Sequence, residues 1–314
     1  MNDKDVIDGH DIRGQFSVLR FPAGLGGNAA WRPVKERKVI TQYDCNHCED
    51  DTLNYLTPDQ IETFHEDGYL AFDGLLPADL NERIKADVDQ MMEDRKAGER
   101  SRSPITYPDM GLLTSEPLIV DRVADLLGPR FSHHHIHARW QGSGEPGVHW
   151  HHDYEQYPQT NRSHPMVHVF MYLDGLNGEI GDLLVLPGSH KRILNRDALQ
   201  EFGYSDLPGS VTINALGPGS IVIVHSAVLH ARRPKPGGES YRRYFIDTSY
   251  CPDGILWPLG KYHQSLNQHA FDNGYDRNGK YAFLYDNSRF YDFDEYKERL
   301  HEHNVGSLAL IIQP

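Results

Sequence analysis

Two histidines and one aspartate form the residue pattern that most clearly suggests chemistry in this sequence. His151 and Asp153 stand two residues apart in the segment VHWHHDYE at 148–155. Side chains at positions i and i+2 of a β-strand point to the same face, so this imidazole and this carboxylate could bind one ion. His152 should then point to the opposite face, and His149 is a rival ligand because it shares the face of His151.

A third ligand has to come from a distant strand. His230 is the best candidate, because it follows a Gly-Pro-Gly turn at 217–219 and a strand-like run at 220–224. Two histidines and one carboxylate on one side of an iron ion leave three coordination positions open, as in the non-haem Fe(II) oxygenases. The sequence therefore predicts a metal site that can take a chelating cosubstrate and O2.

The elements that must position these residues fall into two groups along the chain. Capping signals and apolar stripes predict helices at 57–67, 77–98 and 115–128. Short apolar or β-branched runs separated by Gly- and Pro-containing turns then predict strands at 136–141, 167–173, 183–186, 211–215, 221–225 and 244–250. Short strands with such turns favour an antiparallel sandwich or barrel. A tail rich in Tyr, Asn and Asp follows, with one expected helix at 294–303.

Composition excludes several classes of protein. The 314 residues include 31 Lys and Arg against 45 Asp and Glu, a formal net charge of −14 that argues against nucleic-acid or anionic-membrane binding. No apolar run approaches the roughly 20 residues of a membrane span, and the first residues lack the pattern of a secretory signal. Three cysteines are an odd, low number that suits a reducing compartment, so we expect a cytoplasmic protein.

Cys45 and Cys48 form a CxxC pair within the polar segment 1–55. Such a pair can be half of a zinc site or a redox couple. A closed zinc site needs four ligands, and Cys251 is far away in the sequence. We favour free thiols in an N-terminal extension that packs on the main body, with a zinc site that includes His47 as the alternative.

From residue 56 to residue 250 the chain resembles the phytanoyl-CoA dioxygenase (PhyH) family of Fe(II)- and 2-oxoglutarate-dependent oxygenases. Three segments carry the resemblance: LTPDQIETFHEDGYL at 56–70, LPGSHK at 186–191 and GPGSIVIVH at 217–225. The resemblance implies a mainly β fold with flanking helices around a double-stranded β-helix, a jelly-roll or cupin-like core. It also implies that Fe(II), 2-oxoglutarate and O2 are the cofactors and cosubstrates.

Within that family, WHHDYE at 150–155 is similar to the WHSDFE motif of the ectoine hydroxylase branch. The next residues, Gln156, Tyr157 and Pro158, depart from the Thr-Trp-His of that branch, which argues against ectoine as the substrate. The resemblance implies that His151, Asp153 and His230 are the iron ligands; by the same comparison His225 is rejected as the second histidine.

For 2-oxoglutarate, the resemblance implies an arginine shortly after the second histidine. Arg242 and Arg243 both qualify, and since only one can face inward from a strand, we favour Arg242. The resemblance places Gln141 and Phe170 beside the cosubstrate. Arg232 replaces the small hydroxyl residue that the family usually has two positions after the second histidine; it could bind 2-oxoglutarate or a substrate anion, or lie in a basic loop at the rim.

On the strand at 136–141, His137 and Arg139 share the face of Gln141. We interpret these two side chains and His152 as candidate substrate contacts. The neighbouring His133 and His134 are expected to be surface residues.

Together these features predict an enzyme that hydroxylates a C–H bond of a polar or anionic small molecule and releases succinate and CO2. The alternatives are desaturation, epoxidation or cyclisation with the same cofactors, or a cupin-like metal-binding module without turnover. The expected organisation is an extension at 1–55, an oxygenase domain at 56–250 (helices at 57–128, β core at 130–250) and a tail at 251–314 that packs on or caps the core. No nucleic-acid or membrane partner is expected, and the protein would be a monomer or a homodimer.

Overall fold

The computed structural model describes residues 55–98, 102–142, 144–155, 164–179, 181–192, 200–234, 242–259 and 263–292. All of them belong to the compact unit Val39–Pro314. The predicted extension with Cys45 and Cys48, and the helix expected at 294–303, lie outside the described residues. Among the residues that are described, no helix has the length and apolar character that crossing a bilayer requires.

In the described residues four α-helices precede the strands of the core, apart from one short strand, β1 (Tyr69–Phe72). They are α1 (Pro58–Asp67), α2 (Ala78–Lys96), α3 (Pro108–Leu113) and α4 (Pro117–Leu127), whereas the sequence predicted three and missed α3. The Thr57 side chain accepts from the Gln60 backbone N–H while the Gln60 side chain accepts from the Thr57 N–H, so the capping box is confirmed. The stretch predicted as one helix from 115 begins at Pro117, after the separate helix α3.

The strands form two antiparallel sheets. The larger sheet has the order β1-β7-β4-β9-β2, and the smaller one has the order β3-β8-β5-β6. The strands of the larger sheet are β1, β7 (Ser220–His225), β4 (Val167–Tyr172), β9 (Arg243–Pro252) and β2 (Phe131–Gln141). Those of the smaller sheet are β3 (Val148–His151), β8 (Leu229–Arg232), β5 (Leu183–Leu186) and β6 (Val211–Ile213).

The remaining described elements are a strand pair, one helix and several short turns. A parallel pair, β10 (Trp257–Leu259) and β11 (Phe290–Asp292), flanks α5 (His263–Asp272). Short 3-10 turns are η1 (Pro104–Thr106), η2 (Ser189–Lys191), η3 (Gln200–Phe202), η4 (Ala282–Tyr285) and η5 (Asn287–Arg289). In the described part of the tail, Tyr275, Tyr281 and Tyr285 pack in the core cluster of the helical layer.

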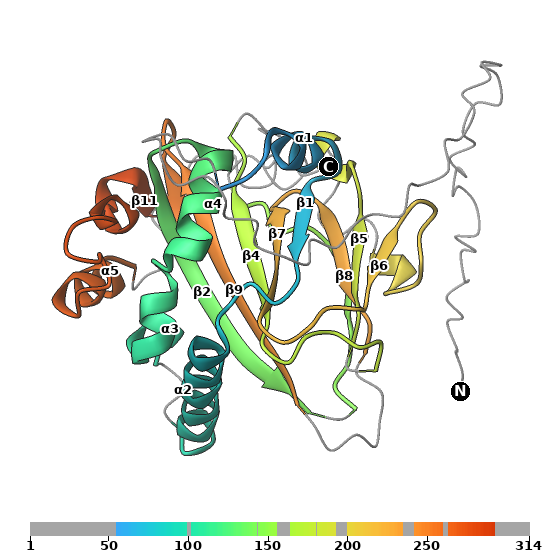
Figure 1. Ribbon diagram of the computed structural model, residues 1–314, viewed down its shortest axis with the longest axis horizontal. Helices are drawn as coiled ribbons and strands as arrows, with labels where there is room; N and C mark the ends of the chain where they lie inside the picture. Colours follow the sequence, from blue (N-terminus) through green and yellow to red (C-terminus); the bar gives the residue numbers. More distant parts are fainter. Residues whose placement is uncertain are drawn as a thin grey trace, which may run out of the picture. The chain divides into compact units, whose positions relative to one another are not determined.

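The larger sheet is buried on both faces, and each face has a different partner. On the outer face, Val169, Met171 and Ile223 pack in one cluster with apolar residues of α2 and α4; Figure 1 shows these helices lying against the sheet. On the inner face, Phe170 and Tyr172 pack with residues of the smaller sheet, among them Leu183 and Val185. The alternation along β4 thus fills two layers, and the predicted jelly-roll fold is confirmed.

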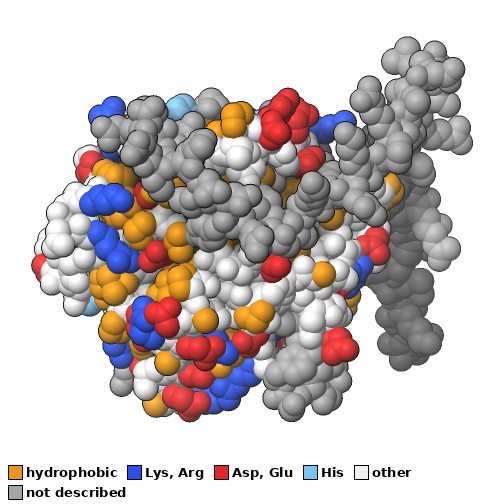
Figure 2. Space-filling view, viewed as in Figure 1, with side chains coloured by type: hydrophobic (Ala, Val, Ile, Leu, Met, Phe, Trp, Pro, Cys, Tyr) orange, Lys and Arg blue, Asp and Glu red, His pale blue; other side chains and the backbone are white. Residues whose placement is uncertain are grey.

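The solvent side of the helical layer carries mixed charges. On the face seen in Figure 2, acidic and basic side chains intermingle around α2. Arg83 pairs with Asp79 at 2.8 Å and Lys96 with Glu93 at 2.7 Å. Ion pairs of this exposed kind contribute little to stability, because water and salt screen them. The stability of this layer therefore comes from its buried apolar face.

Gly68 is needed where α1 passes into β1, and its substitution by alanine should destabilise the fold. Its φ of 83° is left-handed, and an added Cβ would collide with Val228 and His190. The strain and the collision together should lower the free energy of unfolding by about 2–5 kcal/mol. Denaturant unfolding of Gly68→Ala would measure the loss.

Gly98→Ala is the matched control, because its φ is 104° but nothing lies within 4 Å of the added Cβ. It should cost only the backbone strain, about 1–2 kcal/mol. Equal losses in the two variants would show that the contact with Val228 and His190 does not matter.

Candidate active site

The three predicted metal ligands meet at the edge of the smaller sheet. β3 and β8 are antiparallel neighbours, and their register places His151 directly opposite His230. Asp153 follows β3 and turns its carboxylate toward both rings. Its Oδ1 lies 3.5 Å from His151 Nε2 and its Oδ2 lies 3.1 Å from His230 Nε2. The three ligand atoms lie within 4.8 Å of one another.

Backbone carbonyl groups fix the orientation of both imidazoles. His151 Nδ1 lies 2.7 Å from the carbonyl oxygen of His149, and His230 Nδ1 lies 3.1 Å from that of Val228. Because a carbonyl only accepts, each Nδ1 carries the donated proton, so loss of the Nε2 proton leaves a neutral ring whose lone pair faces Asp153. This is the tautomer that a metal-binding histidine needs. The donor set and its orientation therefore fit an iron ion held by His151, Asp153 and His230.

The protonation state of Asp153 also suits metal binding. Burial alone would raise the pKa of its carboxyl group, but the adjacent His230 and His151 hold that pKa well below its usual range. The group is therefore a carboxylate, the form that binds a cation.

Arg243, at the start of β9, supplies a buried cation on the inner face of the larger sheet. Its side chain is 2% exposed, and it donates from Nη1 to Gln141 Oε1 at 2.8 Å. It lies over the ring of Tyr172, 5.0 Å from the centroid. No described carboxylate pairs with it. Burial, the largest influence, lowers the pKa of this guanidinium.

Three buried polar atoms around this guanidinium have no hydrogen-bond partner in the described structure: Arg243 Nε, Gln141 Nε2 and Tyr172 Oη. All three can donate, and buried donors are normally satisfied. A carboxylate would accept from them and neutralise the arginine. The residues present therefore fit the distal carboxylate of 2-oxoglutarate.

The prediction that Arg242 faces inward is wrong. The Arg242 side chain is 43% exposed, pairs with Asp89 Oδ1 at 2.8 Å and lies over the Trp140 ring at 4.3 Å. The reason is the register of β2 with β9, which pairs Gln141 with Arg243. Residues 243, 245 and 247 therefore share the inner face, whereas Arg242 precedes the strand and turns outward.

One cavity of about 200 Å³ is lined by the three predicted metal ligands and by Arg243. Phe170 forms part of its wall, with its ring 5.2 Å from that of His230. Arg232 also lines it, donating from Nη2 to the carbonyl oxygen of Pro146 at 2.9 Å. Burial and then the nearby charge of Arg243 lower the pKa of Arg232 to about 10. The other lining residues are Val148, Tyr172, Leu183, Ala231, Phe245 and Asp247.

The residues predicted to contact the substrate do not line this cavity. His137 and Arg139 are exposed on the inner side of β2, and Arg139 pairs with Glu145 at 2.9 Å. His152 is buried, and its Nδ1 accepts from the Tyr154 N–H at 3.3 Å. The rival ligands also stay apart from the three ligands: His149 lies near Tyr204, and His225 stacks beside His190 with ring centroids 4.8 Å apart.

The sequence reasoning missed a group of polar residues further along the inner face. His168 Nδ1 lies 3.0 Å from both carboxylate oxygens of Asp247. Burial would lower the pKa of His168, but Asp247 outweighs it and raises that pKa to about 9. Side chains alternate along a strand, so counting every second residue from Arg243 would have placed Asp247 on the same inner face. His133 and His134, expected at the surface, are buried, and His134 Nε2 lies 2.6 Å from the carbonyl oxygen of Pro258.

A jelly roll that holds two histidines and a carboxylate beside a buried arginine defines the class of 2-oxoglutarate-dependent iron oxygenases. Comparison of the sequence with known families agrees, because the family described as phytanoyl-CoA dioxygenase (PhyH) matches residues 64–242, more than half of the chain. The chain belongs to the phytanoyl-CoA dioxygenase family, and the resemblance seen in its motifs is confirmed. Members of this class use Fe(II), 2-oxoglutarate and O2.

A curated relative is the probable alpha-ketoglutarate-dependent hypophosphite dioxygenase of Stutzerimonas stutzeri. It is 27% identical over 197 residues, which cover 56% of this chain and 66% of that protein. The match thus spans slightly less than two thirds of the length of the relative.

Solved structures share the fold. The EctD structure from S. alaskensis with 2-oxoglutarate and 5-hydroxyectoine has a TM-score of 0.53 at 18% identity, covering 70% of this chain and 86% of that one. HygX from Streptomyces hygroscopicus with nickel and 2-oxoglutarate gives 0.52 at 16%, covering 65% and 91%. The carbocyclase SnoK from nogalamycin biosynthesis gives 0.52 at 15%, covering 68% and 91%. At these identities the likeness concerns the fold alone.

Proposed function

We propose that this protein is a dioxygenase that hydroxylates a C–H bond of a polar or anionic small molecule while 2-oxoglutarate is converted to succinate and CO2. One observation carries the proposal: two imidazoles, a carboxylate and a buried arginine with no described carboxylate partner line the same cavity. The family membership supports it.

In this proposal His151, Asp153 and His230 hold the iron. When bound, the iron supplies the activation of O2 that is coupled to decarboxylation of 2-oxoglutarate. Two imidazoles and one carboxylate would hold the ion by three positions, and the remaining positions would be available to the cosubstrate. Their hydrogen bonds to backbone carbonyls keep both rings in place, so little reorganisation accompanies metal binding.

Arg243 binds the distal carboxylate of 2-oxoglutarate, and Gln141 and Tyr172 complete that site. A charged group taken from water without a partner costs several kcal/mol, and the incoming carboxylate offsets this cost. The guanidinium is held by Gln141 and by the Tyr172 ring, so its fork is already oriented when the ligand arrives. Phe170 gives the cosubstrate an apolar wall and excludes water.

Arg232 favours an anionic substrate. It is the second guanidinium in the cavity, and no described carboxylate neutralises it either. One distal carboxylate of 2-oxoglutarate offsets one of these two charges, which leaves the other for a substrate anion. The curated relative named for hypophosphite, itself an anion, is consistent with this substrate class.

A second outcome keeps the same residues and changes only the product. SnoK, which shares the fold, is named a carbocyclase. Cyclisation, desaturation or epoxidation would require a different placement of the substrate C–H bond rather than different ligands. Product analysis by mass spectrometry distinguishes these outcomes, because hydroxylation adds one oxygen atom and desaturation removes two hydrogens.

Anaerobic titration of Fe(II) and 2-oxoglutarate into the metal-free protein tests the metal and cosubstrate sites. The wild type should develop the weak visible charge-transfer band of the chelated keto acid, and His151→Ala should not. Arg243→Ala should need at least about 30-fold more 2-oxoglutarate, since losing a buried hydrogen-bonded charge pair costs about 2 kcal/mol or more. Arg243→Lys keeps the charge but loses the planar fork, so its requirement should lie between those of the wild type and Arg243→Ala.

Arg242→Ala is the matched control for this titration and should stay within about twofold of the wild type, because the pair that it breaks is exposed. A loss in Arg242→Ala with none in the Arg243 variants would contradict the cosubstrate assignment. If the wild type binds iron but shows no band, the non-catalytic metal module becomes the better interpretation.

Arg232→Met should separate the substrate from the cosubstrate. We expect it to bind 2-oxoglutarate within about threefold of the wild type and to lose the acceleration of succinate release by small anions, including hypophosphite, carboxylates and phosphonates. Each acid is compared with its neutral methyl ester or amide where one exists. Equal acceleration by acid and neutral analogue in both proteins would contradict an anionic substrate.

A further inference from the structure

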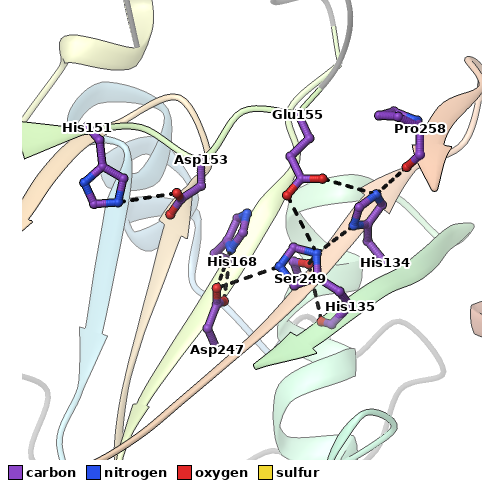
Figure 3. Close-up of polar contacts among 9 residues, drawn as sticks. All are labelled: His134, His135, His151, Asp153, Glu155, His168, Asp247, Ser249 and Pro258. Carbon is purple, nitrogen blue, oxygen red and sulfur yellow. Dashed lines mark hydrogen bonds and ion pairs between the residues drawn. The ribbon is translucent and has the colours of Figure 1, made fainter. Parts of the chain in front are cut away.

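A second set of metal-binding side chains lies on the inner face of the larger sheet and shares no residue with the first set. It consists of His135 on β2, His168 on β4 and Asp247 on β9, which we call the second histidine cluster. These strands are neighbours in the order β4-β9-β2. Ser249 of β9 stands opposite both His135 and His168, and Asp247 lies two residues away on the same strand face. Three adjacent strands thus each contribute one inward side chain (Figure 3).

The distances within this cluster fit a common ion. His168 Nδ1 is 3.0 Å from each oxygen of Asp247, and His135 Nε2 is 4.0 Å from Asp247 Oδ2. One ligand atom from each residue lies within 4.8 Å of the others. Ligands about 2.1 Å from a metal are separated by roughly 3–4 Å, so a small movement of His135 would complete the site.

Contacts at the Nδ1 atom of His135 leave its Nε2 atom to bind such an ion. Its Nδ1 is engaged by Ser249 Oγ at 3.0 Å and by His134 Nδ1 at 2.7 Å, while Nε2 faces Asp247. Histidine ligands commonly use their other nitrogen in this way, to fix the ring. Glu155 is 3.9 Å from the same Nδ1 and adds a negative charge behind the ring.

Two of the three side chains are buried and that of His135 is partly buried. His168 is 1% exposed and Asp247 is 7% exposed. Asp247 nevertheless lines the cavity, so an ion can reach the cluster from it. A neighbouring group of three, His134, His135 and Glu155, is a weaker candidate, because His134 Nε2 already lies 2.6 Å from the Pro258 carbonyl oxygen.

We propose that His135, His168 and Asp247 bind a second divalent transition-metal ion beside the iron site. Two imidazole nitrogens and one carboxylate suit Zn²⁺, Mn²⁺, Co²⁺ or Fe²⁺ rather than Ca²⁺ or Mg²⁺, which prefer oxygen ligands. Three protein ligands leave coordination positions for water or for an anion in the cavity. Coordination displaces the proton that His168 shares with Asp247.

Anaerobic titration of the full-length, metal-free protein with Co(II) tests this site, with the metal counted by equilibrium dialysis and by the visible d–d bands. The wild type should bind two equivalents. His168→Ala, Asp247→Asn and His135→Ala should each bind one, and His151→Ala should also bind one. Asp247→Asn keeps the shape of the side chain, so it reports on the ligand even if His168→Ala fails to fold.

His65→Ala is the control, because His65 is an exposed histidine on α1 outside both ligand sets, and it should still bind two equivalents. One equivalent in the wild type that disappears in His151→Ala would overturn the second site and leave the proposed function intact. One equivalent that survives in His151→Ala but disappears in Asp247→Asn would instead overturn the iron assignment.

Discussion

The pairing register of two strand pairs is the constraint on which the rest of this structure depends. β3 with β8 sets His151 opposite His230, and β2 with β9 sets Gln141 opposite Arg243. Because side chains alternate between faces, a slip of one residue in either pair would turn a ligand or the buried arginine out of the cavity. Such a slip would also move the apolar side chains of the same strands from the core into water. Because this exposure is unfavourable, these side chains hold the register.

The cavity beside the larger sheet contains an unusual number of charged side chains. Arg243 and Arg232 face the same cavity as Asp153 and Asp247. Charges in such surroundings are expensive unless partners neutralise them. The layered apolar clusters on both faces of the larger sheet supply the stability that tolerates this cost. The cavity is therefore organised for charged ligands before any ligand binds, which is the arrangement that favours tight binding with little rearrangement.

How much of the site could be predicted depends on how far apart in the sequence the interacting residues lie. Thr57 and Gln60 act on each other within one turn, so the start of α1 could be predicted from the sequence. Asp153 is two positions after His151 but lies beyond the end of β3, and its backbone N–H donates to the Ser226 carbonyl, so the strand alternation that pointed to this pair does not by itself set its geometry. His133 and His134 were wrongly expected at the surface, because their burial depends on β9 and on the segment around Pro258, which no local pattern indicates.

By itself the sequence indicated the class of fold, the three candidate metal ligands and the family, because local spacing, turn signals and contiguous motifs express these features. Only the tertiary structure decided that Arg243 rather than Arg242 faces the cavity, since adjacent strand residues differ only in which side of the sheet they reach. It likewise revealed His135, His168 and Asp247 as one cluster. These residues come from three strands, and their proximity arises from hydrogen-bonded pairing between segments distant in the chain.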